Sequence, residues 1–249
     1  MPMKHPAMQP NPNPRREIAA MVFAVVFPSV ITWIYFVSLR GAPAAAQQAA
    51  YGIGKLIQFG FPVAWVALIA REQIFQWRRP AISGISIGIV SGLCVFAAAV
   101  GLYVLFLKPW GAFDVAREIA QAKVSGLAID SIWKYCLLGV FYSVFHSGME
   151  EYYWRWFVHG RLRRLVGVPA SIRISSFGFM AHHVIVLAFY FGMTSPLTYF
   201  FSVAVAVGGA FWAWLYERSG TISTSWISHA IVDVVIFAIG FDIIREVLV

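Results

Sequence analysis

Long apolar runs restrict the fold of this chain more than any other feature. Several runs reach about 18 residues or more with few charges, a length that spans the ~30 Å hydrocarbon core of a bilayer as a helix. In total 60% of the residues are hydrophobic and 12% are charged, against about 25% charged in soluble domains. A lipid-exposed segment must satisfy its own backbone hydrogen bonds. The sequence therefore predicts an all-α fold, a polytopic transmembrane helix bundle.

The apolar runs predict about seven spans. They cover residues 18–39, 49–70, 81–107, 131–164, 174–191, 196–216 and 222–244. The fourth exceeds the hydrocarbon thickness, so we expect its end to leave the membrane. Residues 108–130 mix charged and apolar positions at helical spacing, which predicts an extra helix at the interface. Gly84, Gly88 and Gly92 form a ridge of small residues that lets another helix approach closely.

The positive charges predict the orientation. With the N-terminus inside, more Lys and Arg residues fall on the cytoplasmic side than outside, as the positive-inside rule requires. The inner set is Lys4, Arg15, Arg16, Arg71, Arg78, Arg79, Arg155, Arg161, Arg163, Arg164, Arg173 and Arg218, and the outer set is Arg40, Lys108, Arg117, Lys123, Lys134 and Arg245. We therefore expect a multi-pass protein of the cell's inner (plasma) membrane with a cytoplasmic N-terminus.

The domain organisation predicted is simple. Residues 1–17 are polar and Pro-rich and are expected to form a disordered cytoplasmic tail. Residues 18–249 form a single transmembrane domain, with a motif-bearing core at 131–244. The net charge of +8 is assigned to contacts with anionic lipid rather than nucleic acid, because no basic helix with interleaved aromatic residues is present.

Ionisable residues inside spans are costly and are therefore functional candidates. The fourth span carries Glu150, Glu151 and Arg155. Glu151 and Arg155 are four residues apart and can pair on one helix face. Glu150 is rotated by about 100° from its neighbour. It is thus left free, and burial without a partner would suit it to proton transfer.

Histidines occur in two later spans. His182 and His183 are adjacent in the fifth span, where neighbouring residues project to different faces, so at most one is expected to share a site with Glu150. His229 and Asp233 lie four residues apart in the seventh span and share one face. Together these groups predict a convergent polar site inside the bundle.

These motifs resemble those of the CPBP (Abi) superfamily, which includes the type II CAAX prenyl endopeptidases. The motifs are Glu150-Glu151 with Arg155, Phe179 with His183, and His229 with Asp233, over residues 131–244. The resemblance implies a glutamic-type intramembrane endopeptidase that cleaves a membrane-embedded or lipid-anchored peptide or protein tail. It implies that Glu150 and His183 activate the attacking water, and that His229 and Asp233 stabilise the oxyanion. Glu151 and Arg155, with Phe179, would be supporting residues.

The sequence departs from the prenyl-protease pattern at Asp233, where Asn is typical. An ionised Asp cannot donate a hydrogen bond, so Asp233 either is protonated or acts by orienting His229. A zinc protease on Glu150, His183, His229 and Asp233 is the main rival mechanism. The absence of a His-Glu-x-x-His motif favours a site without metal or other cofactor. The same residues are also compatible with a non-catalytic immunity or adaptor protein and with a proton-coupled transporter.

Overall fold

The computed structural model describes residues 14–72 and 80–248, and within these ranges every regular element is helical. Six helices there are long and apolar enough to cross a membrane. They are α1 (Pro14–Trp33) continued by η1 (Ile34–Ser38), α2 (Ala44–Ala64) by η2 (Trp65–Ala70), α3 (Ile82–Leu102) by η3 (Tyr103–Leu107), α8 (Val168–Phe191), α9 (Pro196–Ser219), and α10 (Ile222–Ile244) by η6 (Arg245–Val247). The predicted all-α transmembrane bundle is confirmed, and the chain is a multi-pass membrane protein.

The predicted fourth span differs from these six. It is one helical segment composed of α5 (Ile132–Val140), η4 (Phe141–His146), α6 (Ser147–Glu151), η5 (Tyr152–His159) and α7 (Gly160–Val166). Its polar residues keep it out of the set that is apolar enough to cross a membrane. The polar groups are instead buried by other helices: Glu150, Glu151 and Arg155 are each at most 4% exposed. The part of the segment that carries these charged groups, α6 and η5, therefore lies inside the bundle, surrounded by protein rather than lipid.

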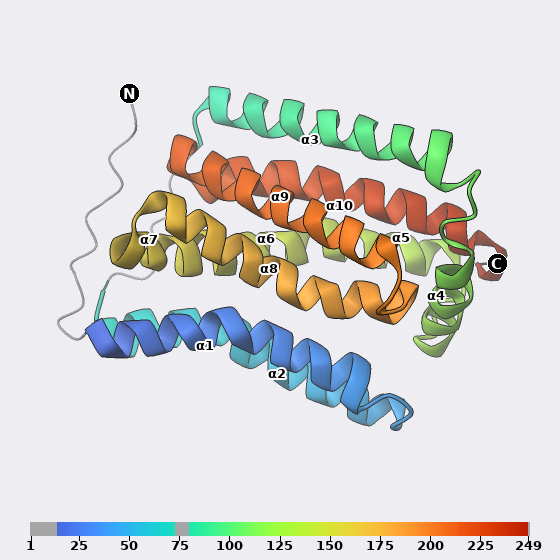
Figure 1. The fold of residues 1–249 in the computed structure, drawn as a ribbon, viewed down its shortest axis with the longest axis horizontal. Coiled ribbons are helices and arrows are strands. Elements are labelled where there is room, and N and C mark those ends of the chain that lie inside the picture. The colour runs from blue at the N-terminus through green and yellow to red at the C-terminus, as the bar shows by residue number, and fades with distance from the viewer. Residues whose placement is uncertain (1–13, 73–79, 249) are drawn as a thin grey trace.

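The helices form layers, which Figure 1 shows. On one side α3 packs along α10, which contacts α9 and α6 in turn. On the other side α1 and α2 pack together, and α1 contacts α8. The strongest pairings include that of α8 with α9. Helix α10 contacts this segment from α5 to η5, and α1, α2, α8 and α9 surround its η5 stretch.

The ends of two elements differ from the prediction. Helix α1 begins at Pro14, so residues 14–17, expected to belong to the tail, are its first turn, and Glu17 is buried against Arg161 at 2.6 Å. Residues 1–13 lie outside the described residues. Helix α8 begins at Val168 rather than at 174, because Gly167 (φ +78°) ends α7 and Pro169 suits the first turn of the next helix. The predicted extra helix is α4 (Asp114–Gly126), which contacts α8 and α10.

The glycine ridge of α3 faces α10, as predicted. Gly84, Gly88 and Gly92 are the buried residues of α3. A Cβ atom at Gly88 would lie 2.6 Å from the backbone oxygen of Thr224, and one at Gly92 would lie 2.9 Å from Ile231 Cβ. The absence of side chains on the ridge thus allows the two helices to touch along their backbones.

We expect Gly88→Ala to destabilise the protein by about 1–3 kcal/mol, because a backbone carbonyl cannot move aside for the added methyl group. The measurement is unfolding in detergent. Gly101→Ala on the same helix is the matched control, since a Cβ there meets no described atom within 4 Å. That change should be neutral or stabilising. Equal unfolding midpoints for the two variants would contradict the close approach of α3 and α10.

Candidate active site

The two adjacent glutamates lie on α6, between two π-helical stretches. η4 precedes α6 and η5 follows it, so the wider turns flank the Glu150-Glu151 pair on both sides. Such π-helical turns occur often at functional sites, because they alter the direction of neighbouring side chains. Both carboxylates are buried, with Glu151 fully enclosed and Glu150 4% exposed. The site is therefore built around two buried acidic groups that point in different directions.

Glu151 pairs with Arg155, as the four-residue spacing predicts. Arg155 Nη2 lies 3.2 Å from Glu151 Oε1, at ion-pair distance although not aligned as a hydrogen bond. The guanidinium also lies over the rings of Phe179, at 5.0 Å, and Trp212, at 5.4 Å. These contacts tie the start of η5 to α8 and α9, so Arg155 holds Glu151 in a fixed position.

Glu151 has a second partner, which the sequence did not predict. His229 Nδ1 lies 2.9 Å from Glu151 Oε1, so His229 can donate its Nδ1–H to this carboxylate. The imidazole stacks on Trp212, with ring centroids 3.8 Å apart and planes 16° apart. A carboxylate on one ring nitrogen and an aromatic ring on one face define the tautomer and orientation of His229.

The other nitrogen of His229 faces the free carboxylates. His229 Nε2 lies 3.7 Å from Glu150 Oε2 and 3.7 Å from Asp233 Oδ1. The shared helix face predicted for His229 and Asp233 is therefore observed. Asp233, however, does not touch the Nδ1 side of the ring, because Glu151 occupies it.

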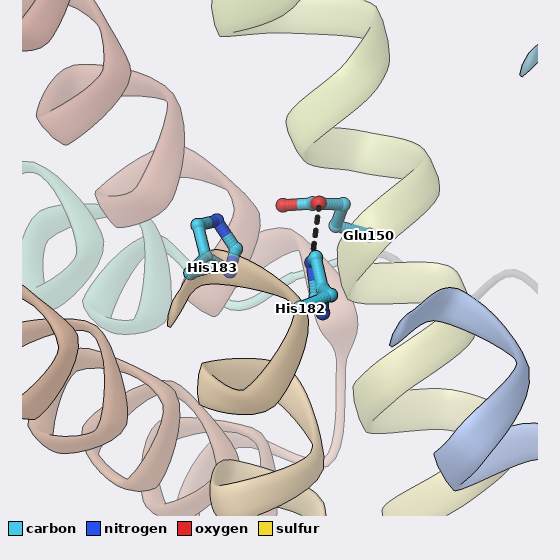
Figure 2. A group of neighbouring side chains, drawn as sticks. All are labelled: Glu150, His182 and His183. Atoms are coloured by element: carbon cyan, nitrogen blue, oxygen red, sulfur yellow. Dashed lines mark ion pairs between the residues drawn. The ribbon is translucent and has the colours of Figure 1, made fainter. Parts of the chain in front are cut away.

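Both histidines of α8 lie beside Glu150, which corrects the expectation that at most one would do so. Figure 2 shows the two imidazoles on α8 facing Glu150 on α6. His182 Nε2 lies 4.0 Å from Glu150 Oε1, and one ligand atom from each of the three residues lies within 4.8 Å of the others. Neighbouring residues on a helix differ in direction by about 100°. The Glu150 carboxylate lies between the directions of His182 and His183, so both side chains can approach it.

The surroundings of the two histidines differ. His182 is buried, and its ring lies parallel to that of Trp154, with centroids 5.8 Å apart. His183 is only partly buried, and its Nδ1 lies 2.8 Å from the backbone oxygen of Phe179, one turn earlier. That bond leaves Nε2 of His183 unprotonated in the neutral ring and available to a ligand. The ring of Phe179 packs 4.7 Å from His183 and 6.0 Å from His229, so it spaces the two imidazoles.

Sequence reasoning missed His146. Its Nδ1 lies 3.9 Å from Glu150 Oε1, and its ring contacts Tyr142 and Phe59. Its Nε2 is buried without a hydrogen-bond partner among the described residues. The signal was present, because His146 precedes Glu150 by four residues, the spacing that was applied to Glu151 and Arg155. Glu150 thus has three imidazoles, those of His146, His182 and His229, within 4.0 Å.

One part of the site offers a set of metal ligands. Glu150, His182 and His183 bring a carboxylate oxygen and two imidazole nitrogens close enough to bind one ion. Zinc accepts these donors, and a catalytic zinc site uses three protein ligands and one open position. This set differs from the one expected from the sequence, because His182 takes part while His229 and Asp233 belong to a separate pair.

Comparison with known proteins gives one match. Residues 132–235 match the family described as type II CAAX prenyl endopeptidase Rce1-like. No curated protein and no solved structure matches the chain. The matched residues extend from α5 through α10 and contain every site residue described above. Residues 132–235, which carry the site, are therefore similar to the Rce1-like type II CAAX prenyl endopeptidase family, and the resemblance seen in the motifs is confirmed.

Proposed function

We propose that the protein is a glutamic-type intramembrane endopeptidase, which hydrolyses a peptide bond with an activated water molecule. The observation that carries this proposal is the division of labour between two neighbouring carboxylates. Glu151 is engaged by Arg155 and His229, whereas Glu150 faces imidazole groups from three helical segments. A buried carboxylate next to proton-accepting rings, rather than paired with an arginine, is suited to general-base catalysis.

The reaction follows from this arrangement. Glu150 takes a proton from water while the oxygen attacks the scissile carbonyl carbon, with His183 Nε2 positioning the water. The negative charge that develops on the carbonyl oxygen is stabilised by His229, which donates from Nε2 as the imidazolium ion, and by Asp233, which donates only in its protonated form. The C–N bond then breaks, and the proton held by Glu150 passes to the leaving amine.

The substrate proposed is a membrane-embedded or lipid-anchored peptide or protein tail. The family description names CAAX prenyl tails, and a site enclosed by spanning helices is reached most directly by a chain already held at the membrane. We further propose the topology expected from the sequence. The N-terminus faces the cytoplasm, and residues 18–249, together with the first turn of α1, form one domain in the plasma membrane.

The test is hydrolysis of a synthetic peptide with a prenylated cysteine and three further residues, by purified protein in detergent, followed by mass spectrometry. We expect one cut within the tail. Activity should persist in a strong chelator, and the protein should hold well below one zinc ion per chain. If chelation abolishes cleavage and zinc restores it, a zinc mechanism on Glu150, His182 and His183 replaces the metal-free one. A well-folded protein that binds the peptide without cutting it would support an immunity or adaptor role.

A comparison of the two histidines of α8 separates the mechanisms further. We expect His183→Ala to lower kcat/KM by about 10²-fold or more, because its free Nε2 is the accessible one. His182→Ala should cost less, through lost packing on Trp154. The measurement is the cleavage rate of the same peptide. Equal losses together with a loss of bound zinc in both variants would indicate metal ligation, and a loss confined to His182→Ala would reject the assignment of His183.

Asp233→Asn tests the position at which the sequence departs from the prenyl-protease pattern. We expect kcat/KM to stay within about tenfold of the wild type, because Glu151 already binds His229 Nδ1 and an Asn amide can donate to an oxyanion. The measurement is the rate at neutral pH, with thermal stability as the control. A larger loss, above about 1.4 kcal/mol of barrier, in a stable variant would show that the carboxylate itself is needed.

A further inference from the structure

Lys55 is a lysine within the second span, where a positive charge faces the interior of the bundle. Lys55 Nζ lies 3.2 Å from Gln58 Oε1, and it lies over the rings of Tyr51, at 5.3 Å, and Phe59, at 5.4 Å. Within residues 14–72 and 80–248, no carboxylate lies at ion-pair distance from it. A cation at membrane depth is costly and is rarely retained without a role.

Gln58 holds this ammonium group in place. The Gln58 side chain is fully buried, and its Nε2 has no hydrogen-bond partner in the part of the chain that the structure describes. Its Oε1 uses one of the three N–H donors of Lys55, which leaves two for another acceptor. Lys55 itself is only partly buried. The rings of Tyr51 and Phe59 and the amide of Gln58 thus surround the Lys55 ammonium group, which keeps two N–H donors unused.

Lys55 lies next to the reacting groups. The ring of Phe59, beneath the ammonium group, contacts the ring of His146, with centroids 6.4 Å apart, and His146 Nδ1 lies 3.9 Å from Glu150. The cation therefore flanks the site from α2, on the side of His146. This position lies outside the residues that match the family.

We propose that Lys55 binds the C-terminal carboxylate of the substrate tail. This inference rests on the proposed endopeptidase function. Phe59 and His146 connect the two groups: the ring of Phe59 lies 5.4 Å from the ammonium group and 6.4 Å from the ring of His146, and His146 Nδ1 lies 3.9 Å from Glu150. A peptide tail inside an apolar site also carries one obligatory anion, its terminal carboxylate, and a buried charge-assisted hydrogen bond to it is strong.

The opposing interpretation is that Lys55 only balances the charge of Glu150. The two roles differ in their dependence on the substrate. A counter-charge would affect every substrate equally, whereas a carboxylate-binding residue would affect only substrates with a free C-terminus.

The experiment compares two prenylated peptides that are identical except that one ends in a carboxylate and the other in a carboxamide. We expect the wild type to cleave the carboxylate peptide with a kcat/KM about 10–100-fold higher, the range of a charge-assisted hydrogen bond. Lys55→Met should remove this preference by slowing only the carboxylate peptide, and Lys55→Arg should retain part of it. Lys134→Met is the control, because Lys134 Nζ is half-exposed and pairs with Asp130 and the backbone oxygen of Ala128, apart from the rings of Tyr51 and Phe59.

The outcomes are distinct. If the wild type cleaves neither peptide, the proposed function fails. If it cleaves both at the same rate, the endopeptidase stands and the role of Lys55 is rejected, without reliance on any variant. If Lys55→Met slows both peptides equally while its unfolding midpoint is unchanged, Lys55 is a counter-charge, and the proposal is likewise overturned.

Discussion

Glu150→Gln is expected to lower the cleavage rate by about 10²–10⁴-fold, the contribution that general acid–base catalysis makes. Glutamine has nearly the same shape as glutamate, but its amide cannot take a proton from water. Glu150 has no arginine or lysine at ion-pair distance among the described residues; the groups that face it are histidines at 3.7–4.0 Å. The variant should therefore lose the base while it keeps most of the packing.

The measurement is single-turnover cleavage of the prenylated peptide, with the unfolding midpoint in detergent recorded alongside. Glu118→Gln is the matched control, since Glu118 lies on α4, away from the site. Its rate should equal that of the wild type. A rate for Glu150→Gln within tenfold of the wild type would remove Glu150 from the mechanism and with it the proposed function.

Most of the fold could be predicted from the sequence, because a helix that crosses the lipid hydrocarbon must carry a long apolar run. Six predicted spans coincide with observed helices to within a few residues at most ends, since each carries a long apolar run. The segment α5–α7 follows a different rule. Other helices surround the polar part of this segment, so that part does not need apolar side chains facing lipid. Its hydropathy is therefore lower than that of the six spans, and hydropathy alone predicts its position less well. Its π-helical stretches have no comparable signature in the hydrophobic pattern.

Within the site, contacts along one helix were predictable and contacts between helices were not. The Glu151–Arg155 and His229–Asp233 pairs follow from a spacing of four residues, which the geometry of the helix determines. The bond from His229 to Glu151 depends on how α10 is rotated against α6, and no single-helix rule supplies that angle. The placement of Lys55 has the same origin, since α2 is remote from the motifs in sequence.

Glu151→Gln is expected to lower kcat/KM by about 10²–10⁴-fold, although the motif pattern suggests only a supporting role. Glu151 Oε1 accepts a hydrogen bond from His229 Nδ1, at 2.9 Å, and lies at ion-pair distance from Arg155 Nη2, at 3.2 Å. A glutamine has no charge to pair with Arg155, and its amide can present a donor, rather than an acceptor, to His229. Replacing the aspartate that orients a catalytic histidine by asparagine costs about 10⁴-fold in a serine protease triad.

A stability effect accompanies this loss and has to be separated from it. Arg155 is 1% exposed, so removal of its charged partner leaves a buried cation uncompensated, which costs about 3–5 kcal/mol. Arg155→Gln breaks the same ion pair from the other end and leaves the bond between Glu151 and His229 intact. Both variants should unfold at lower temperature, but Arg155→Gln should retain a rate at least about tenfold above that of Glu151→Gln when each is assayed below its unfolding transition. Equal rates would mean that Glu151 anchors the helix through Arg155 and that the orientation of His229 depends on something else.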